Sequence, residues 1–471
     1  MTPEEFRRVG HELIDWIAAY RAHAPDRPVS RDCAPGSIRA LLPAAPPEHA
    51  EPMTAVLRDL ERIVVPGLTD WQHPRFFGYF PGNSLLSGVL GDLASTGLGV
   101  LGLTWQSSPA LTELEEVVTD WVRQMVDLPR EFRGVIQDTA STSTLIALIC
   151  ARERASEYAL GRGGLQGEPR ALRVYVSEHC HSSVDKAALL ADFGRNNLRR
   201  VPCDGEYALR PEALESLIKA DLAAGHRPAA VVATVGTTTT TAMDPVAAIA
   251  TIARRHGLWL HVDAAMAGGA MILPECRALW AGVEHADSLV LNAHKWLGVP
   301  FDCSLYFVRD SEHLVRVMST NPSYLQSSVD GRVTQYRDWG IPLGRRFRAL
   351  KLWFVLREQG VEGLAKRIRR DLANAQALAK TIRAAEHWRV LAPVRLQTLC
   401  IRHEPPSMGA AALDKHTLAW VSRLNSSGAA FLTPAQLDGR WMARVSIGSL
   451  STEAADIADA WRAILAAAAA G

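Results

Sequence analysis

The chain has 471 residues, 48% of them hydrophobic and 21% charged, which excludes a disordered or collagen-like protein. Its 51 lysines and arginines balance 50 aspartates and glutamates, so the net charge offers no attraction for nucleic acid or an anionic membrane. The apolar runs fall short of the roughly 18 residues of a membrane-spanning helix, and the seven cysteines include no CxxC pair. These features predict a large cytoplasmic protein, most simply an enzyme, with neither nucleic-acid nor membrane partners.

Residues 1–84 are predicted to form helices joined by proline-rich connectors. Thr2 is a candidate N-cap followed by Pro3, and apolar residues between Phe6 and Ile17 fall on one helical face. Helices with one apolar stripe each are too thin to enclose a core. We therefore expect this segment to pack on a partner subunit.

Residues 85–360 alternate between short apolar runs and helical stretches, and this region is predicted to be the large ligand-binding domain. One helix is marked by Asp244 as N-cap, Pro245 in its first turn and a stop at Gly257. The alternation predicts an α/β fold with a mainly parallel sheet covered on both faces. The predicted strands are residues 173–177, 229–235, 258–262, 288–291 and 304–308.

Residues 361–471 are predicted to form a small α+β domain. A long helix over residues 361–386 precedes two strand-like runs, near residues 389–403 and 440–448. An alanine-rich helix closes the chain.

Two motifs in the sequence give only weak evidence for a ligand site. Residues 97–102 spell a literal GxGxxG, but the preceding stretch is helical in pattern, so a small-residue turn is favoured over a dinucleotide site. The run His179-Cys180-His181 suggests zinc, but no second cluster completes a tetrahedral ligand set. We predict no metal site.

The informative signal is a pair of charged residues after two predicted strands. Asp263 and Lys295 each follow an apolar run, and a lone residue of this kind is usually just solvated. Two of them on one parallel sheet would face the same ligand crevice. A buried lysine is readily tuned to a neutral amine that forms a Schiff base, and a buried aspartate needs a cationic partner. A pyridinium nitrogen is such a partner, so the pair favours pyridoxal phosphate (PLP).

A candidate phosphate site precedes a predicted helix over residues 145–156. Residues 137–144 are rich in serine and threonine, and hydroxyl and backbone N–H groups at a helix N-terminus bind a dianion well. An ordinary polyhydroxyl N-cap is the alternative interpretation.

The ordered set of motifs resembles the PLP-dependent aromatic-L-amino-acid decarboxylases of the group II decarboxylase family, and bacterial DOPA-decarboxylase-like members look most similar. The resemblance covers nearly the whole chain and implies a homodimer with the PLP-dependent transferase fold of the aspartate aminotransferase type (fold type I). The motifs that carry it are Asn292-Ala293-His294-Lys295-Trp296, His261-Val262-Asp263-Ala264-Ala265, His181-Ser182-Ser183, Trp105 with Ser108-Pro109, Gly236-Thr237-Thr238 and residues 342–348.

The resemblance also implies roles for individual residues. Lys295 would bind the cofactor covalently, Asp263 would pair with its ring nitrogen, and His181 would stack on the ring. Tyr324, on a predicted lid over residues 318–339, would donate a proton to the carbanion. The phosphate would be held by Ala140, Ser141, Asn292 and His294, with Thr238 and Ala265 as further cofactor-site residues, Thr238 lying near the substrate carboxylate.

The implied substrate pocket lies at the dimer interface. Trp71, Tyr79, Phe80 and Gly344 would line it, and Leu101 and Leu103 would enter from the partner. Many relatives carry Phe where this chain has Leu103, Thr where it has Gly82, and Tyr where it has Met266. These departures leave the ranking of substrates open.

The implied reaction is decarboxylation of an aromatic L-amino acid to its amine, with DOPA favoured over 5-hydroxytryptophan, tryptophan, tyrosine and phenylalanine. One alternative is an aromatic aldehyde synthase, an outcome that accompanies loss of the lid tyrosine or the stacking histidine; both are retained here as Tyr324 and His181. A catalytically decayed binding protein is a second alternative. A NAD-dependent oxidoreductase, resting only on the glycine run, is a distant third.

Overall fold

The computed structural model describes residues 1–320 and 329–470. The chain forms two compact units. The larger comprises Gly82–Arg370 and Ala392–Leu396, and the smaller comprises Met1–Pro81, Asp371–Leu391 and Gln397–Gly471. The division into domains at residues 1–84, 85–360 and 361–471 stays a prediction.

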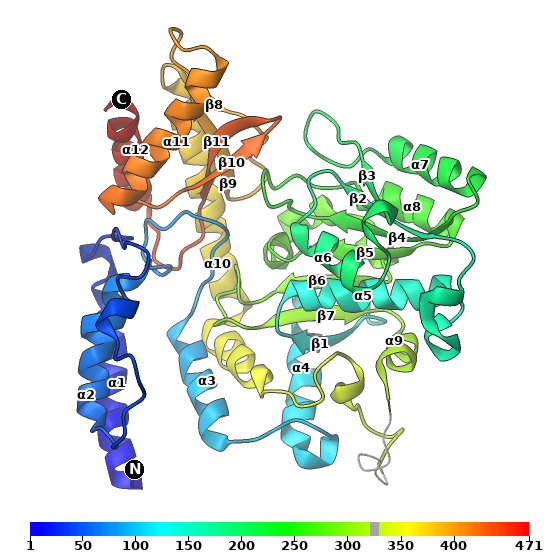
Figure 1. Ribbon diagram of the computed structural model, residues 1–471, viewed down its shortest axis with the longest axis horizontal. Helices are drawn as coiled ribbons and strands as arrows, with labels where there is room; N and C mark the ends of the chain where they lie inside the picture. Colours follow the sequence, from blue (N-terminus) through cyan, green and yellow to red (C-terminus); the bar gives the residue numbers. More distant parts are fainter. Residues whose placement is uncertain (321–328, 471) are drawn as a thin grey trace. The chain divides into compact units, whose positions relative to one another are not determined.

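The larger unit is built on a sheet that has seven strands in the described part of the chain, in the order β1-β7-β6-β5-β4-β2-β3 (Figure 1). β7 runs antiparallel to both of its neighbours, and the remaining strands run parallel to one another. This confirms the predicted α/β fold with a mainly parallel sheet. The strands are β1 (Arg133–Gln137), β2 (Leu172–Ser177), β3 (Leu198–Val201), β4 (Arg227–Thr234), β5 (Trp259–Asp263), β6 (Ser288–Asn292) and β7 (Ser304–Val308).

Both faces of this sheet are covered, as the uninterrupted apolar runs predict. On β4, Val232 belongs to a core that also contains Ile146 of α5 and Val184 of α6, while its neighbour Val231 is equally buried on the opposite face. Helices α7 and α8 pack together and contact β4, and α5 contacts β4 and packs against α6. The helices are α5 (Ala140–Ala155), α6 (Ser182–Leu190), α7 (Pro211–Ala223) and α8 (Val246–His256).

The remaining helices of the larger unit are α3 (Leu86–Leu98), α4 (Pro109–Met125), α9 (Ser311–Met318) and the first part of α10 (Arg348–Ala384). Small residues let α3 approach α10 closely, because a Cβ added at Gly91 would lie 2.7 Å from Lys351 Cα. α3 ends at Gly99, whose φ of 64° is left-handed. The glycine run therefore begins within the last residues of α3, whereas a dinucleotide fingerprint follows a strand. The small-residue turn stays the favoured interpretation.

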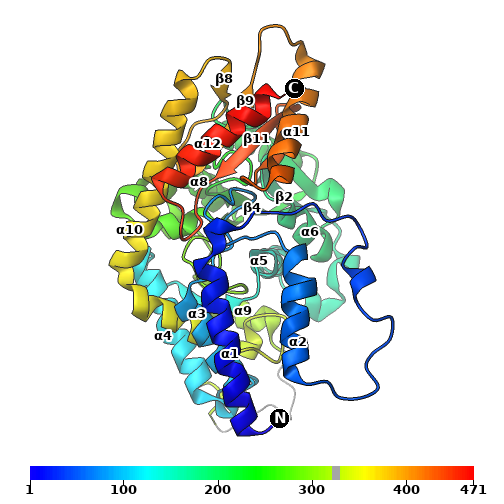
Figure 2. The ribbon, with the colours of Figure 1, turned by 90° about the vertical axis from the view of Figure 1, so that its left-hand side faces the viewer.

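The smaller unit contains an antiparallel sheet in the order β10-β11-β9-β8. Thr2 caps the first helix as predicted, since the Glu5 N–H donates to Thr2 Oγ1 at 3.2 Å. Figure 2 shows α11 and α12 side by side. The elements are α1 (Pro3–Ala22), α2 (Met53–Asp59), β8 (Trp388–Val390), β9 (Thr398–His403), α11 (Ala410–Ser427), β10 (Thr433–Leu437), β11 (Arg440–Ser446) and α12 (Ala454–Ala469).

One predicted helix boundary is wrong. α8 begins at Val246 with Pro245 in the capping position, and Asp244 is not its N-cap. The Asp244 carboxylate instead accepts the backbone N–H groups of Leu209 (2.8 Å) and Thr234 (2.7 Å). Its full burial raises the pKa of Asp244 to about 7. Among the described residues, no helix is long and apolar enough to cross a membrane.

Candidate active site

The predicted site residues of the larger unit gather at the carboxyl edge of the parallel strands. Asp263 is the last residue of β5, and it pairs in register with Thr234 of β4 and Val290 of β6. The turn after β5 is tied to β6, because the Asn292 N–H donates to the Ala265 carbonyl at 3.0 Å. Carboxyl ends of adjacent parallel strands lie about 4.8 Å apart, so these residues lie close together at one edge of the sheet.

Asp263 is a buried acid that lacks a cationic partner in the described chain. Its side chain is only 5% exposed, and its Oδ1 accepts the Ala265 N–H at 3.1 Å. The salt bridges of residues 1–320 and 329–470 do not include Asp263, whose charge acts instead on the His181 ring. A buried carboxylate without a partner is costly. The Asp263 side chain is therefore suited to pair with a cationic group of a bound ligand.

His181 follows β2 and caps the N-terminus of α6. The Ser183 N–H donates to His181 Nδ1 at 3.1 Å, and the Ser183 hydroxyl lies 2.8 Å from the same atom. Because Nδ1 accepts, the proton of the neutral ring sits on Nε2. Partial desolvation lowers the pKa of His181, the Lys295 charge lowers it further, and the Asp263 charge opposes both. The ring is thus neutral near pH 7 and within electrostatic reach of both strand-end residues.

Lys295 follows β6 in a turn that is held on both sides. Its N–H donates to the Asn292 carbonyl at 3.1 Å, and its carbonyl accepts from Asn83 Nδ2 at 3.4 Å. The next residue, Trp296, is fully buried, and its carbonyl accepts from Arg367 at 2.7 Å. The side chain of Lys295 is half-buried on this fixed backbone.

The N-terminus of α5 provides a site for an anion. Thr139 at the capping position has extended backbone angles, and its side chain makes no capping hydrogen bond within the described chain. The first N–H groups of the helix, beginning with Ala140 and the exposed Ser141, are therefore available to a ligand. Gln137 at the end of β1 and Asn292 at the end of β6 both pair with Ser304 of β7, one on each side.

His294 lies at the same end of the site as Asn292. The Cys303 N–H donates to His294 Nδ1 at 2.9 Å, so the neutral ring carries its proton on Nε2. Burial, followed by the charges of Lys295 and Lys351, lowers the pKa of His294 to about 4. The buried Asn292 Oδ1 has no hydrogen-bond partner among the described residues. Thr238 lies half-buried in the loop after β4, where Thr237 Oγ1 accepts the Ala242 N–H at 3.0 Å.

A polar network beneath Asp263 was not predicted from the sequence. His261 lies two residues earlier on β5 and therefore points to the same face as Asp263. Its Nδ1 lies 2.9 Å from Ser288 Oγ, and its Nε2 lies 3.5 Å from Thr144 Oγ1 of α5. Complete burial lowers the pKa of His261 to about 4. The signal in the sequence that could have identified His261 is its spacing of two residues from Asp263 along one strand.

Three of the predicted substrate-pocket residues come together in the larger unit. A Cβ added at Gly344 would lie 3.4 Å from Leu101 and 3.7 Å from Leu103. The other three lie in the smaller unit, where Trp71 and Tyr79 stack with ring centroids 5.4 Å apart and Arg444 lies over the Phe80 ring.

The predicted proton donor Tyr324 lies outside the described residues, as does part of the predicted lid.

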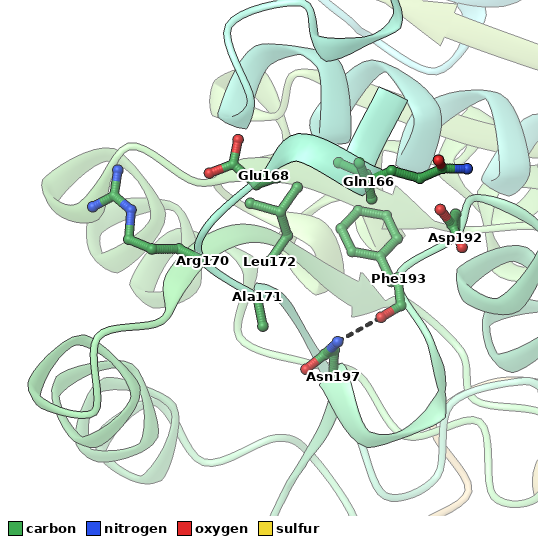
Figure 3. Close-up of a pocket in the computed structure, with 9 residues that line it drawn as sticks. Gln166, Glu168, Arg170, Ala171, Leu172, Asp192, Phe193 and Asn197 are labelled. Carbon is green, nitrogen blue, oxygen red and sulfur yellow. Dashed lines mark hydrogen bonds between the residues drawn. The ribbon is translucent and has the colours of Figure 1, made fainter. Parts of the chain in front are cut away.

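A distinct pocket occurs at the amino end of β2, the opposite edge of the sheet from the candidate site (Figure 3). None of the predicted site residues lines it. Its lining residues are Leu165, Gln166, Glu168, Arg170, Ala171, Leu172, Asp192, Phe193 and Asn197.

Known proteins resemble this chain along nearly its whole length. Residues 35–404 match the pyridoxal-dependent decarboxylase conserved domain. The chain belongs to the pyridoxal-dependent decarboxylase family. It is 40% identical to a phenylacetaldehyde synthase of Arabidopsis thaliana over 98% of this chain and 96% of that protein. It is also 40% identical to an aromatic-L-amino-acid decarboxylase of Bos taurus over 98% of this chain and 95% of that protein.

The solved structure of Oryza sativa TDC with PLP and tryptamine superposes with a TM-score of 0.96 at 36% identity, covering 100% of this chain and 99% of that one. As a pyridoxal-dependent decarboxylase, the protein is an enzyme, a carboxy-lyase of fold type I that uses PLP. The residues at the sheet edge fit this cofactor. The buried Asp263, which joins no salt bridge of the described residues, suits a protonated ring nitrogen, and the N-terminus of α5, which lacks a side-chain cap, suits a phosphate.

Proposed function

We propose that this pyridoxal-dependent decarboxylase converts an aromatic L-amino acid, with DOPA favoured, to the corresponding amine and CO₂. The observation that carries the proposal is the placement of Asp263 at the end of β5 and of Lys295 after the adjacent strand β6, with both charges acting on the His181 ring. The aromatic class is supported by relatives named for tryptophan and tyrosine decarboxylation, which are 38% and 39% identical to this chain.

When bound, PLP supplies a sink for the electrons left on the α-carbon as the carboxylate departs. Lys295 would hold the cofactor covalently, and Asp263 would keep a proton on its ring nitrogen. His181, whose Nδ1 accepts the Ser183 N–H, would stack on the ring. Tyr324 would supply the proton that replaces the carboxylate.

The phosphate would be held by Ala140 and Ser141 of α5, by Asn292 at the end of β6 and by His294 in the following turn. Thr238 and Ala265 complete the cofactor site. We propose that the aromatic residues Trp71, Tyr79 and Phe80 contact the substrate side chain; Trp71 and Tyr79 stack on one another. We propose the same role for Leu101, Leu103 and Gly344 of the larger unit.

We propose that the enzyme is a homodimer, with Leu101 and Leu103 entering the partner's pocket. The outward face of α3 supports this, because Leu86, Leu90 and Leu93 are each nearly half exposed at helical spacing. A Leu90→Asp/Leu93→Asp variant should sediment as a monomer and lose most activity, whereas Leu222→Asp, an exposed leucine of α7, should remain dimeric. A wild-type monomer, or a fully active monomeric variant, would contradict the proposed assembly.

The direct test is to incubate the holoenzyme with a panel of amino acids and measure CO₂ and amine. We expect stoichiometric amine and CO₂ from one or more of DOPA, 5-hydroxytryptophan, tryptophan, tyrosine and phenylalanine, with DOPA giving the highest kcat/KM. Turnover of glutamate alone would overturn the aromatic assignment. Absence of CO₂ from every substrate would favour a decayed binding protein.

An aromatic aldehyde synthase is the second candidate, because the Arabidopsis relative bears such a name. That reaction consumes O₂ and releases aldehyde, ammonia and peroxide. In the family that the sequence resembles, aldehyde formation accompanies loss of the lid tyrosine or the stacking histidine. This chain keeps both residues, as Tyr324 and His181. Peroxide below a few percent of CO₂ in the same assays would support decarboxylation, and equimolar peroxide would establish the synthase.

A further inference from the structure

Two loops of the larger unit pair through their backbones beside the proposed substrate pocket. The Gly102 N–H donates to the Arg345 carbonyl at 2.9 Å, and the Arg345 N–H donates back to the Gly102 carbonyl at 3.0 Å. A Cβ added at Gly102 would lie 2.9 Å from Leu111 of α4, so this position faces inward. In extended chain, successive side chains point to opposite sides. Leu101 and Leu103 therefore face the other way.

Arg345 is joined to Glu115 of α4 by an ion pair that is almost completely buried. Arg345 is 5% exposed and Glu115 is fully buried, with two N–O distances of 2.6 and 3.0 Å. The pair also engages β1, because Glu115 accepts the Ile136 N–H at 2.7 Å and Arg345 donates to the Ile136 carbonyl at 2.8 Å. The Tyr336 ring lies 4.9 Å from the guanidinium. Arg345 thus links α4 and β1 through its side chain, and the Gly102 loop through its backbone.

A buried ion pair contributes little net stability compared with a well-packed apolar pair. Its bidentate geometry does fix position and direction. What it fixes here is the backbone that carries Leu101 and Leu103 on one loop and Gly344 on the other. A Cβ added at Gly344 would be in ordinary van der Waals contact with both leucine side chains. These are the residues proposed to contact the aromatic side chain of the substrate.

We propose that Arg345 and Glu115 are positioning residues for substrate discrimination. The Arg345–Glu115 ion pair fixes the position of the surface formed by Leu101, Leu103 and Gly344. The position of this surface determines how large an aromatic side chain fits. This inference rests on the proposed function. It assigns a role to residues that do not themselves touch the substrate.

The test compares three variants of the holoenzyme. Glu115→Gln leaves the Arg345 charge buried and unpaired. Glu115→Leu/Arg345→Met removes both charges and fills the space with apolar side chains, so this variant should still fold. Arg346→Gln is the matched control, because Arg346 is the adjacent arginine but is exposed and pairs with Asp92 at the surface.

The kinetic readout is kcat/KM for tryptophan relative to tyrosine, together with cofactor absorbance. We expect both ion-pair variants to raise KM and shift this ratio by about tenfold, as changes in pocket fit do, while cofactor binding and the control are unchanged. An unchanged ratio, or a fall in kcat alone for both substrates, would overturn the proposal.

A second readout does not depend on turnover. Amide hydrogen exchange of residues 99–105 should accelerate in both ion-pair variants and not in Arg346→Gln, even if no aromatic amino acid is a substrate. Accelerated exchange without aromatic turnover would show that the proposed function, and not the ion pair's positioning of the loop, is wrong. Unaltered exchange would show that the pair does not hold the loop.

Discussion

Replacement of Lys295 by alanine is expected to remove the visible absorption of covalently bound cofactor and to lower kcat by on the order of 10⁴-fold or more, as loss of a member of a catalytic unit does. The reason is that PLP chemistry needs a covalent amine partner, and that the charges of Lys295 and Asp263 both act on the His181 ring. Absorption spectra and single-turnover assays of the purified variant measure both effects.

Lys186→Ala is the matched control for this experiment. Lys186 is an exposed lysine of α6 in the same unit, and its loss should leave spectrum and turnover unchanged. A Lys295→Ala enzyme that kept the visible absorption and turned over within tenfold of wild type would contradict the assignment of Lys295.

Replacement of Asp263 by asparagine should separate cofactor attachment from chemistry. The covalent bond at Lys295 remains possible, but an amide cannot hold a positive charge on the ring nitrogen at a site that is 5% exposed. We expect the bound cofactor's absorption to persist while kcat falls by about 10²–10³-fold, the range for loss of a preorganised electrostatic partner.

Two further variants sharpen this result. Asp263→Glu restores the charge on a longer side chain and should recover part of the activity. Asp120→Asn, at an exposed position of α4, should behave as wild type. An Asp263→Asn enzyme with near-normal kcat would show that the acid is structural.

The strands that form the centre of the sheet could be predicted because they are uninterrupted apolar runs. Residues 304–308 match β7 residue for residue, and the other four predicted strands agree with β2, β4, β5 and β6 within two residues at each end. β1 and β3 were missed. β3 is an edge strand with Arg199 and Arg200 at its centre, and β1 begins with the exposed Arg133, so neither shows a long apolar run.

The strand-end residues of the site were also predictable, because parallel strands bring their carboxyl ends to one edge. The groups that orient them were not. Cys303 fixes the His294 ring through its backbone, and Glu115 meets Arg345 across 230 positions of sequence. Asp244 shows the same limit, since its N-cap pattern was overridden by two distant backbone N–H groups.

The central claim is that one particular amine carries the cofactor. Borohydride reduction of the holoenzyme, followed by proteolysis and mass spectrometry, locates that bond. The structure predicts a single pyridoxyl-modified peptide whose label lies on Lys295. A label on Lys186, Lys351 or any other lysine, or no label on a PLP-saturated enzyme, would contradict the account.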